Sequence, residues 1–180
     1  MDRVPLSPPV IAPVSDGVHR PRWSVMIPVF NCAVFLKETM EAVLAQALPP
    51  EEMQIEVVDD HSTDADVEAL VHSVSEGRIG YFRQPENKGS LRNFETCLNR
   101  ARGYLIHLLH GDDLIKPGYY QAMDELFNRY PQAGAAFCRY EYIGESSKRL
   151  YYRGAEMKEA GILPEALLLL AGRQRLQFCT

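Results

Sequence analysis

Two pairs of adjacent aspartates, each at the end of an apolar run, restrict the fold of this chain more than any other feature. They are Asp59 and Asp60 after residues 55–58, and Asp112 and Asp113 after residues 105–109. Apolar runs of this length that alternate with helical patterns predict a parallel sheet covered on both faces. Ligands of such sheets bind beyond the carboxyl ends of the strands, so four carboxylates are expected at one sheet edge.

The crowding of these carboxylates predicts a binding site at that edge. Neighbouring carboxylates repel one another unless a cation or a hydrogen-bonding ligand uses them. The alternative is that each pair of aspartates caps the helix that follows it.

Size, charge and cysteine spacing restrict the class of the protein. A chain of 180 residues can bury its own core, and its net charge of -5 argues against a dedicated nucleic-acid binder. The cysteines are far apart and form no CxxC pair, so we expect reduced thiols rather than a zinc site or a disulfide framework. We find neither a signal peptide nor a membrane-spanning run, which predicts a cytoplasmic protein.

The order of the expected elements is typical of an α/β layered domain. Residues 1–22 are rich in proline and are expected to form a flexible tail, followed by one domain over residues 23–180. Strands are expected at 23–28, 54–58, 78–84, 104–109 and 133–144, with a hairpin partner at 148–154. Apolar stripes of helices are expected at 36–47, 67–74, 91–101 and 119–130, and a last helix from Pro164. Repeated strand–helix units of this kind predict a mostly parallel sheet.

Local sequence signals predict helix caps and argue against two classes of nucleotide-binding site. Asn31 is the expected cap of the first helix, and Ser62, Thr63 or Asp64 that of the second. GxGxxG and GxxxxGK[ST] are both absent after the first strand. A dinucleotide-binding Rossmann site and a P-loop NTPase therefore lose support.

Four motifs, which lie in three segments of the chain, resemble in order those of family 2 glycosyltransferases, which are inverting enzymes with the GT-A fold. SVMIPVFN at 24–31 resembles the strand motif I-P-x-Y-N, and EVVDDHSTD at 56–64 resembles V-D-D-x-S-x-D. Residues 87–113 resemble the run that begins N-x-G, continues through A-R-N and ends in D-x-D-D. The likeness is good over residues 23–120 and weak beyond. It implies a GT-A, Rossmann-like α/β domain that transfers a sugar from a nucleotide diphosphate to an acceptor hydroxyl with inversion.

The first motif supplies a place for the base of such a donor. Pro28, Val29 and Phe30 follow the first strand and would form a flat apolar wall, with Asn31 closing the motif. The family usually has tyrosine where Phe30 stands, so stacking is kept and a hydroxyl is lost. Core packing is the alternative role for Phe30.

Polar residues of the next two motifs are matched to the ribose, base and diphosphate. Asp59 and Asp60 are both assigned to nucleotide-sugar binding. The resemblance makes Asp60 the better ligand of the base or ribose, and the alternative for Asp59 is a structural role or a helix cap. The guanidinium of Arg92 would form a fork with diphosphate oxygens, and the alternative is a solvated helix arginine. Asn87 is assigned to the same site because its turn shapes the approach to the phosphates.

The last motif carries the metal prediction. Mg²⁺ or Mn²⁺ would neutralise the charge of the departing nucleotide diphosphate. The resemblance makes Asp113 the principal metal ligand and directs Asp112 toward the metal or the ribose. His110 stands where the family usually has aspartate. Imidazole can bind Mn²⁺ but suits Mg²⁺ poorly, so we expect His110 to line the pocket or to support the metal ligands without binding the metal. Gly111 would let the backbone approach the ligand.

No catalytic base is assigned. The resemblance places the base downstream of the metal motif, and no later segment before Thr180 matches it. We therefore expect the base beyond Thr180, a domain truncated on its acceptor side, and donor binding without efficient transfer by this chain. The alternatives are a nucleotide-sugar-binding module without turnover and a metal-dependent nucleotidyltransferase or phosphate hydrolase.

The partners expected from the resemblance are a UDP-sugar and a sugar or lipid-linked acceptor. Polysaccharide biosynthesis is the usual setting of such enzymes, and peripheral association with the inner face of a membrane stays open. A nucleic-acid partner is not expected.

Overall fold

The computed structural model describes residues 5–152 and 159–163 of the chain. The chain divides into two units, residues 1–117 and residues 118–180. The expected single domain over residues 23–180 stays a prediction.

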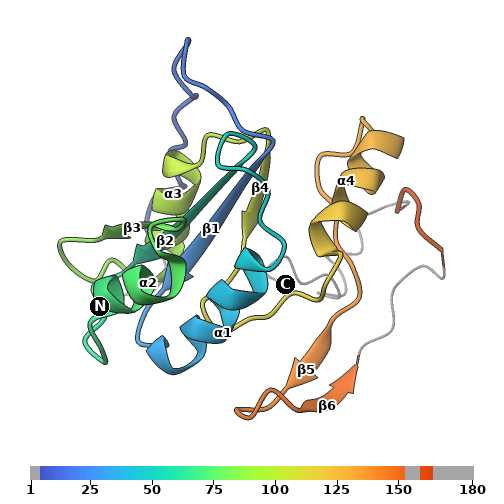
Figure 1. Cartoon of the computed structure of the whole chain (residues 1–180). Coiled ribbons are helices and arrows are strands. Elements are labelled where there is room, and N and C mark those ends of the chain that lie inside the picture. Colours follow the sequence, from blue (N-terminus) through green and yellow to red (C-terminus); the bar gives the residue numbers. More distant parts are fainter. Residues whose placement is uncertain (1–4, 153–158, 164–180) are drawn as a thin grey trace. The chain divides into compact units, whose positions relative to one another are not determined.

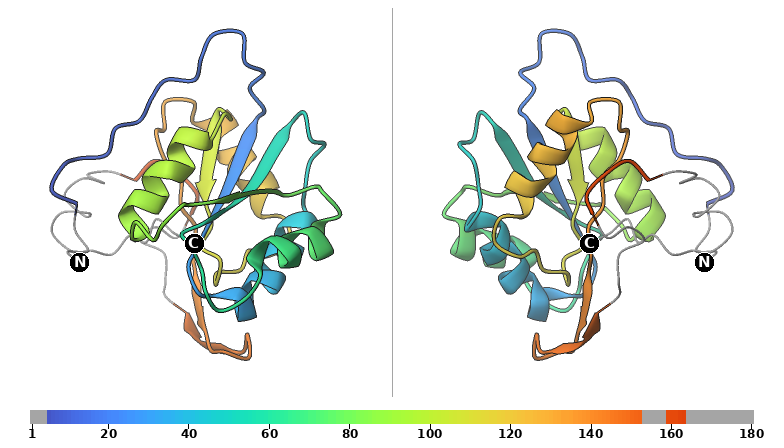
Figure 2. Two further views of the ribbon diagram at one scale, coloured as in Figure 1. Left: turned by 90° about the vertical axis from the view of Figure 1, so that its left-hand side faces the viewer. Right: turned by 90° about the vertical axis from the view of Figure 1, so that its right-hand side faces the viewer.

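The first unit is built on a four-stranded parallel sheet (Figure 1). Its strands are β1 (Trp23–Val29), β2 (Met53–Asp59), β3 (Gly80–Arg83) and β4 (Leu105–Leu108), in the order β3-β2-β1-β4. The helices between them are α1 (Ala33–Leu44), α2 (Val67–Ser75) and α3 (Ser90–Arg100). Figure 2 shows α3 on one face of the sheet and α1 and α2 on the other. The α/β class with a mostly parallel sheet, predicted from the sequence, is confirmed.

Strand β1 lies at the centre of the sheet, and every one of its residues is buried. Pro28 is tolerated there because β4 pairs with β1 only as far as Met26, so no ladder partner is lost on that side. Edge strand β4 differs from the prediction of a fully buried run, because Ile106 is 44% exposed. The helices complete the core with apolar side chains, which include Leu36, Met40, Val43, Val71 and Cys97.

Gly103 carries the chain from α3 into β4 across the backbone of β1. Its N–H donates to Ser24 Oγ at 2.7 Å. A Cβ at this position would lie 2.6 Å from Ser24 N, 2.7 Å from Trp23 C and 2.9 Å from Leu105 O. The junction therefore requires a residue without a side chain.

The helix caps differ from the sequence prediction. Asn31 does not cap α1, because its Oδ1 accepts instead from Thr63 N at 2.8 Å. The exposed N–H of Ala33 in α1 donates to Asp64 Oδ2 at 3.0 Å, so the cap comes from the loop after β2. Helix α2 is capped by Asp66, whose carboxylate accepts from Ala69 N. The cap of α1 therefore comes from a loop that is near only in space, whereas α2 keeps a local cap, two residues after the last one predicted.

The second unit contains α4 (Tyr119–Arg129) and an antiparallel hairpin of β5 (Glu141–Ile143) and β6 (Arg149–Tyr152). The hairpin was predicted, but the strand expected over 133–144 is confined to β5. Alanine and glycine at its start have low strand propensity, which accounts for the difference. The helix expected from Pro164 lies outside the described residues.

The segment before β1 runs along the outer side of α3. Val10 N donates to Glu95 Oε1 at 2.8 Å, Ala12 N donates to Asn99 Oδ1 at 2.8 Å, and Asn99 Nδ2 donates back to Val10 O at 2.9 Å. The flexibility expected for residues 1–22 stays a prediction. None of the helices in the described part of the chain combines the length and apolar character that a membrane span needs.

Candidate functional site

A pocket of about 520 Å³ lies at the carboxyl ends of β1, β2 and β4. Its walls come from the loops after these strands and from the start of α3. The lining residues are Pro28, Val29, Phe30, Cys32, Asp60, Asn87, Lys88, Gly89, Ser90, Asn93, Phe94, His110, Gly111 and Asp112. The pocket thus brings together predicted site residues from all four motifs, namely Pro28, Val29, Phe30, Asp60, Asn87 and Asp112. Asn31, Asp59, Arg92 and Asp113 are predicted site residues outside this lining.

Aromatic side chains give the pocket two flat surfaces. Phe30 is 51% exposed, so core packing, the alternative role for this residue, is wrong. Phe94, from the first turns of α3, stacks on His110 with ring centroids 5.2 Å apart and planes 25° apart. Periodicity placed Phe94 on the apolar stripe of its helix, and only the fold shows that this stripe reaches the pocket.

Asp60 fastens one wall of the pocket to the end of β2. It is 1% exposed, and its two carboxylate oxygens accept from Lys88 N at 2.8 Å and Gly89 N at 2.9 Å. Asn87 Nδ2 donates to the carbonyl of Asp60 at 3.1 Å. Gly89 has a φ of +82°, a conformation that favours glycine. Asp60 therefore holds the 87–89 turn, and each oxygen keeps a lone pair for a ligand.

These bonds predict the effect of the Asp60→Asn variant on stability and on nucleotide binding. The amide group would place an N–H against one of the two backbone donors, and a hydrogen bond to a charged group contributes about 1.5–3 kcal/mol. The free energy of unfolding should fall by about that amount, and nucleotide affinity should fall with it. Urea unfolding measures the effect, and Asp16→Asn, which alters an exposed aspartate, is the control. An unchanged free energy of unfolding would refute the structural role.

Asp59 has a structural role and does not line the pocket. It is fully buried, and its carboxylate accepts from Ser62 N at 2.9 Å, Tyr81 OH at 2.8 Å and Arg83 Nη1 at 2.6 Å. Burial, with the Asp59 carboxylate beside the phenol, contributes to raising the pKa of Tyr81 to about 12. Asp59 therefore joins β2 to β3 and does not cap α2.

Asn31 locks the loops after β1 and β2 together. Its N–H donates to Ser62 Oγ at 3.0 Å, and Asp60 N donates to Val29 O at 2.8 Å. Asn31 has a φ of +50°, which an asparagine tolerates better than most residues. The residue shapes the pocket from outside its lining.

Arg92 points away from the pocket in this structure. Its guanidinium pairs with Glu95, and Nη2 donates to the carbonyl of Ser7 at 3.1 Å and to its hydroxyl at 2.7 Å. The neighbouring Asn93 faces the pocket instead and donates to Val58 O at 2.8 Å. A contact between Arg92 and a diphosphate stays a prediction, and it would require release of these partners.

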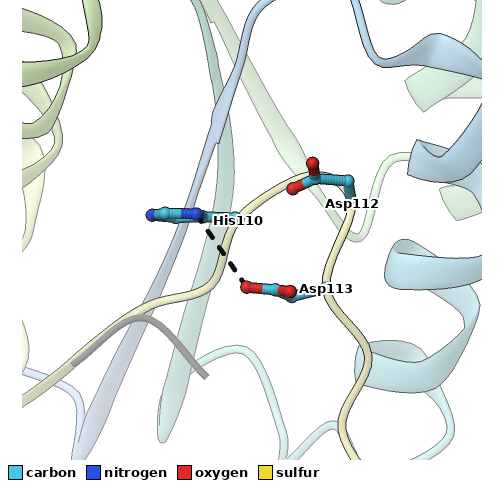
Figure 3. Close-up of side chains that lie close together, drawn as sticks. All are labelled: His110, Asp112 and Asp113. Atoms are coloured by element: carbon cyan, nitrogen blue, oxygen red, sulfur yellow. Dashed lines mark ion pairs between the residues drawn. The ribbon is translucent and has the colours of Figure 1, made fainter. Parts of the chain in front are cut away.

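His110, Asp112 and Asp113 form a cluster at the end of β4 (Figure 3). Each offers a ligand atom within 4.8 Å of the others, and His110 Nδ1 lies 3.9 Å from Asp113 Oδ2. The pKa of Asp113 is raised to about 6, chiefly by burial, with His110 opposing the rise and Asp112 contributing to it. The site thus disfavours the charge of Asp113, and a bound cation would offset that cost. Two carboxylates and an imidazole fit a divalent cation.

Thr39 of α1 holds the turn that carries this cluster. Its buried hydroxyl lies 3.1 Å from the carbonyl of Gly111 and 3.0 Å from that of Asp113. A Cβ at Gly111 would lie 2.8 Å from Cys32 Sγ and 2.9 Å from Val29 Cγ2. The sequence predicted that Gly111 lets the backbone approach the ligand. In the structure the backbone at Gly111 also lies close to the end of β1 and the loop that follows it.

Residues 24–178 match the model of Glycosyl transferase family 2. The chain belongs to this family. An uncharacterised protein of Mycobacterium tuberculosis is 35% identical over 124 residues, which is 69% of this chain and 38% of that protein. An uncharacterised glycosyltransferase of Rickettsia typhi is 26% identical over 140 residues, 77% of this chain and 42% of that protein. The chain thus spans about two fifths of the length of these relatives.

The fold of this member of the family is shared with a solved structure. TarS of S. aureus, residues 1–349 in complex with UDP-GlcNAc, has a TM-score of 0.56 at 20% identity, covering 61% of this chain and 32% of that one. The expected GT-A fold is confirmed. Against the family pattern, Phe30 and His110 are the departures that face the pocket.

Proposed function

We propose that this chain is the donor-binding part of an inverting, divalent-metal-dependent glycosyltransferase. It would bind a nucleotide-diphosphate sugar, with a UDP-sugar as the first expectation, for transfer to the hydroxyl of a sugar or lipid-linked acceptor. The observation that carries the proposal is one pocket that joins an exposed aromatic wall to Asp112, a member of the cluster that also contains His110 and Asp113. The related TarS was solved with UDP-GlcNAc, and a chondroitin synthase of Escherichia coli is 30% identical over 98 residues, 54% of this chain and 14% of that protein.

The base of the donor would lie against Phe30. A flat ring that is half exposed at the pocket offers the stacking surface, and Asp60 offers acceptor lone pairs nearby. Asn31 and Asp59 would act indirectly, because their bonds hold the loops that form this wall.

The diphosphate would lie at the start of α3. Gly89 and Ser90 line the pocket where this helix begins, and the first N–H groups of a helix attract anions. Lys88 and Asn87 line the pocket beside them. The Lys88 ammonium and the first N–H groups of α3 would thus attract the diphosphate, and the contact predicted for Arg92 would add to them.

Asp112 and Asp113 would hold the cation. When bound, Mg²⁺ or Mn²⁺ neutralises negative charge on the leaving nucleotide. Thr39 keeps both aspartates in place through the backbone of their turn. The catalytic base has no assignment, and we place it in a part of the protein beyond this chain.

One alternative keeps support, namely a module that binds the donor without turnover. The chain spans about two fifths of its relatives, and the described residues carry no assigned base. Family membership argues against a nucleotidyltransferase. A role in polysaccharide biosynthesis, a cytoplasmic location and peripheral association with the inner face of a membrane stay predictions.

Calorimetry with UDP-, GDP- and TDP-sugars, in Mn²⁺ and in EDTA, tests the proposal. We expect the sugar nucleotides of one nucleobase to bind best, and their binding to be much tighter in Mn²⁺ than in EDTA. Uridine, which has no diphosphate, is the matched control and should bind equally in both buffers. Absence of binding by every sugar nucleotide in Mn²⁺ would refute the proposed function.

A further inference from the structure

We infer that His110 is a direct nitrogen ligand of the divalent cation, and that this chain therefore prefers Mn²⁺ to Mg²⁺. The inference rests on the proposed function. It reverses the expectation from sequence, which placed His110 in the pocket without a bond to the metal.

The separation between His110 and Asp113 is short enough for both to bind one ion. Nδ1 lies 3.9 Å from Asp113 Oδ2, which is too long for a hydrogen bond. Two atoms that each lie roughly 2.1 Å from one cation are at most about 4.2 Å apart. Figure 3 shows the imidazole and the Asp113 carboxylate facing each other across the turn. Asp112 is exposed and can rotate to complete the set.

Within the described part of the chain, neither ring nitrogen of His110 forms a hydrogen bond. Nε2 is buried without a hydrogen-bond partner there, and the Asp113 contact is too long for Nδ1. A structural histidine would bond through at least one ring nitrogen, because buried polar groups are normally paired. The ring is nevertheless held in place by stacking on Phe94.

The backbone beneath the ring is equally fixed. Thr39 bonds the carbonyls of Gly111 and Asp113, and Gly111 packs against the loop after β1. A ring that is stacked on one side and carried by a fixed turn is preorganised to bind a ligand.

Ligand chemistry then sets the preferred metal. Mg²⁺ takes oxygen ligands and keeps several waters, whereas imidazole nitrogen suits the transition metals. Two carboxylates with one imidazole therefore favour Mn²⁺. Restoring the family's aspartate with His110→Asp would give an oxygen-only set and shift the preference toward Mg²⁺.

Pulsed electron paramagnetic resonance of bound Mn²⁺ tests the inference, because a coordinated imidazole couples its ¹⁴N nucleus to the metal. With UDP and Mn²⁺, we expect this coupling in the wild type and its loss in His110→Asp. The ratio of Mn²⁺ to Mg²⁺ affinity should fall about tenfold in His110→Asp, a change of about 1.4 kcal/mol. His72→Gln, which alters an exposed histidine of α2, should leave both measurements unchanged.

The outcomes separate this inference from the proposed function. Bound Mn²⁺ without nitrogen coupling in the wild type overturns the inference and leaves the proposed function standing. UDP binding that is equal in EDTA and Mn²⁺ also overturns the inference, while keeping the nucleotide pocket. Absence of UDP binding under all conditions overturns both.

Discussion

Replacing Asp113 by asparagine is expected to lower the affinity for UDP in Mn²⁺ by about 100-fold, since a cation contributes several kcal/mol and each 1.4 kcal/mol is tenfold. The amide removes the charge that attracts the cation, while the turn keeps its bonds to Thr39. Calorimetry in Mn²⁺ measures the loss, and Asp16→Asn is the control. An Asp113→Asn variant with wild-type affinity would exclude a metal role for this residue.

The same variant should not unfold. Burial raises the pKa of Asp113 from its ordinary 3.8 to about 6, so the folded state holds the proton more tightly than the unfolded state does. The contribution of this carboxyl to stability is full below about pH 3.8 and is lost as pH rises through about 6. Neutral asparagine lacks that penalty at pH 7. Metal-free Asp113→Asn is therefore expected to be at least as stable as the wild type in urea.

Gly103→Ala is expected to destabilise the first unit by about 3 kcal/mol, the upper end of what overpacking usually costs. The added Cβ would approach three backbone atoms within 2.9 Å, and none belongs to a side chain that can rotate away. Any shift would also stretch the bond from Gly103 N to Ser24 Oγ. Urea unfolding gives the free energy change.

Gly134→Ala provides the matched control for this prediction. A Cβ at Gly134 would meet nothing within 4 Å. Its free energy of unfolding should match the wild type. Equal stability of the two alanine variants would contradict the close packing that we describe at Gly103.

The layered fold was predictable because its signals are local. Continuous apolar runs such as Val25–Ile27 mark strands that are buried on both faces, and helical stripes separate them. Parallel strands carry their following loops to one edge, which is why Phe30, Asp60 and Asp112 were expected together and line one pocket.

The roles of individual polar residues were less predictable, because their partners are distant in sequence. Thr39 reaches carbonyls 72 and 74 residues further on, and Arg92 bonds a serine 85 residues before it. Asp60 resembles a nucleotide ligand in its motif, yet its nearest donors are backbone N–H groups of a turn 28 and 29 residues away. Such pairings arise only when the chain is folded.

Paramagnetic broadening of backbone amide signals by Mn²⁺ in the presence of UDP tests the central claim most directly, because it reports both the nucleotide pocket and the metal cluster. The amides of Gly89 and Gly111 line the pocket and should broaden strongly, while UDP with Mg²⁺ should only shift them. Gly77 precedes β3, near the amino ends of the strands and away from the pocket, and should keep its sharp signal. Broadening centred away from Gly89 and Gly111, or none at all, would contradict a metal-assisted nucleotide-sugar site at the carboxyl ends of these strands.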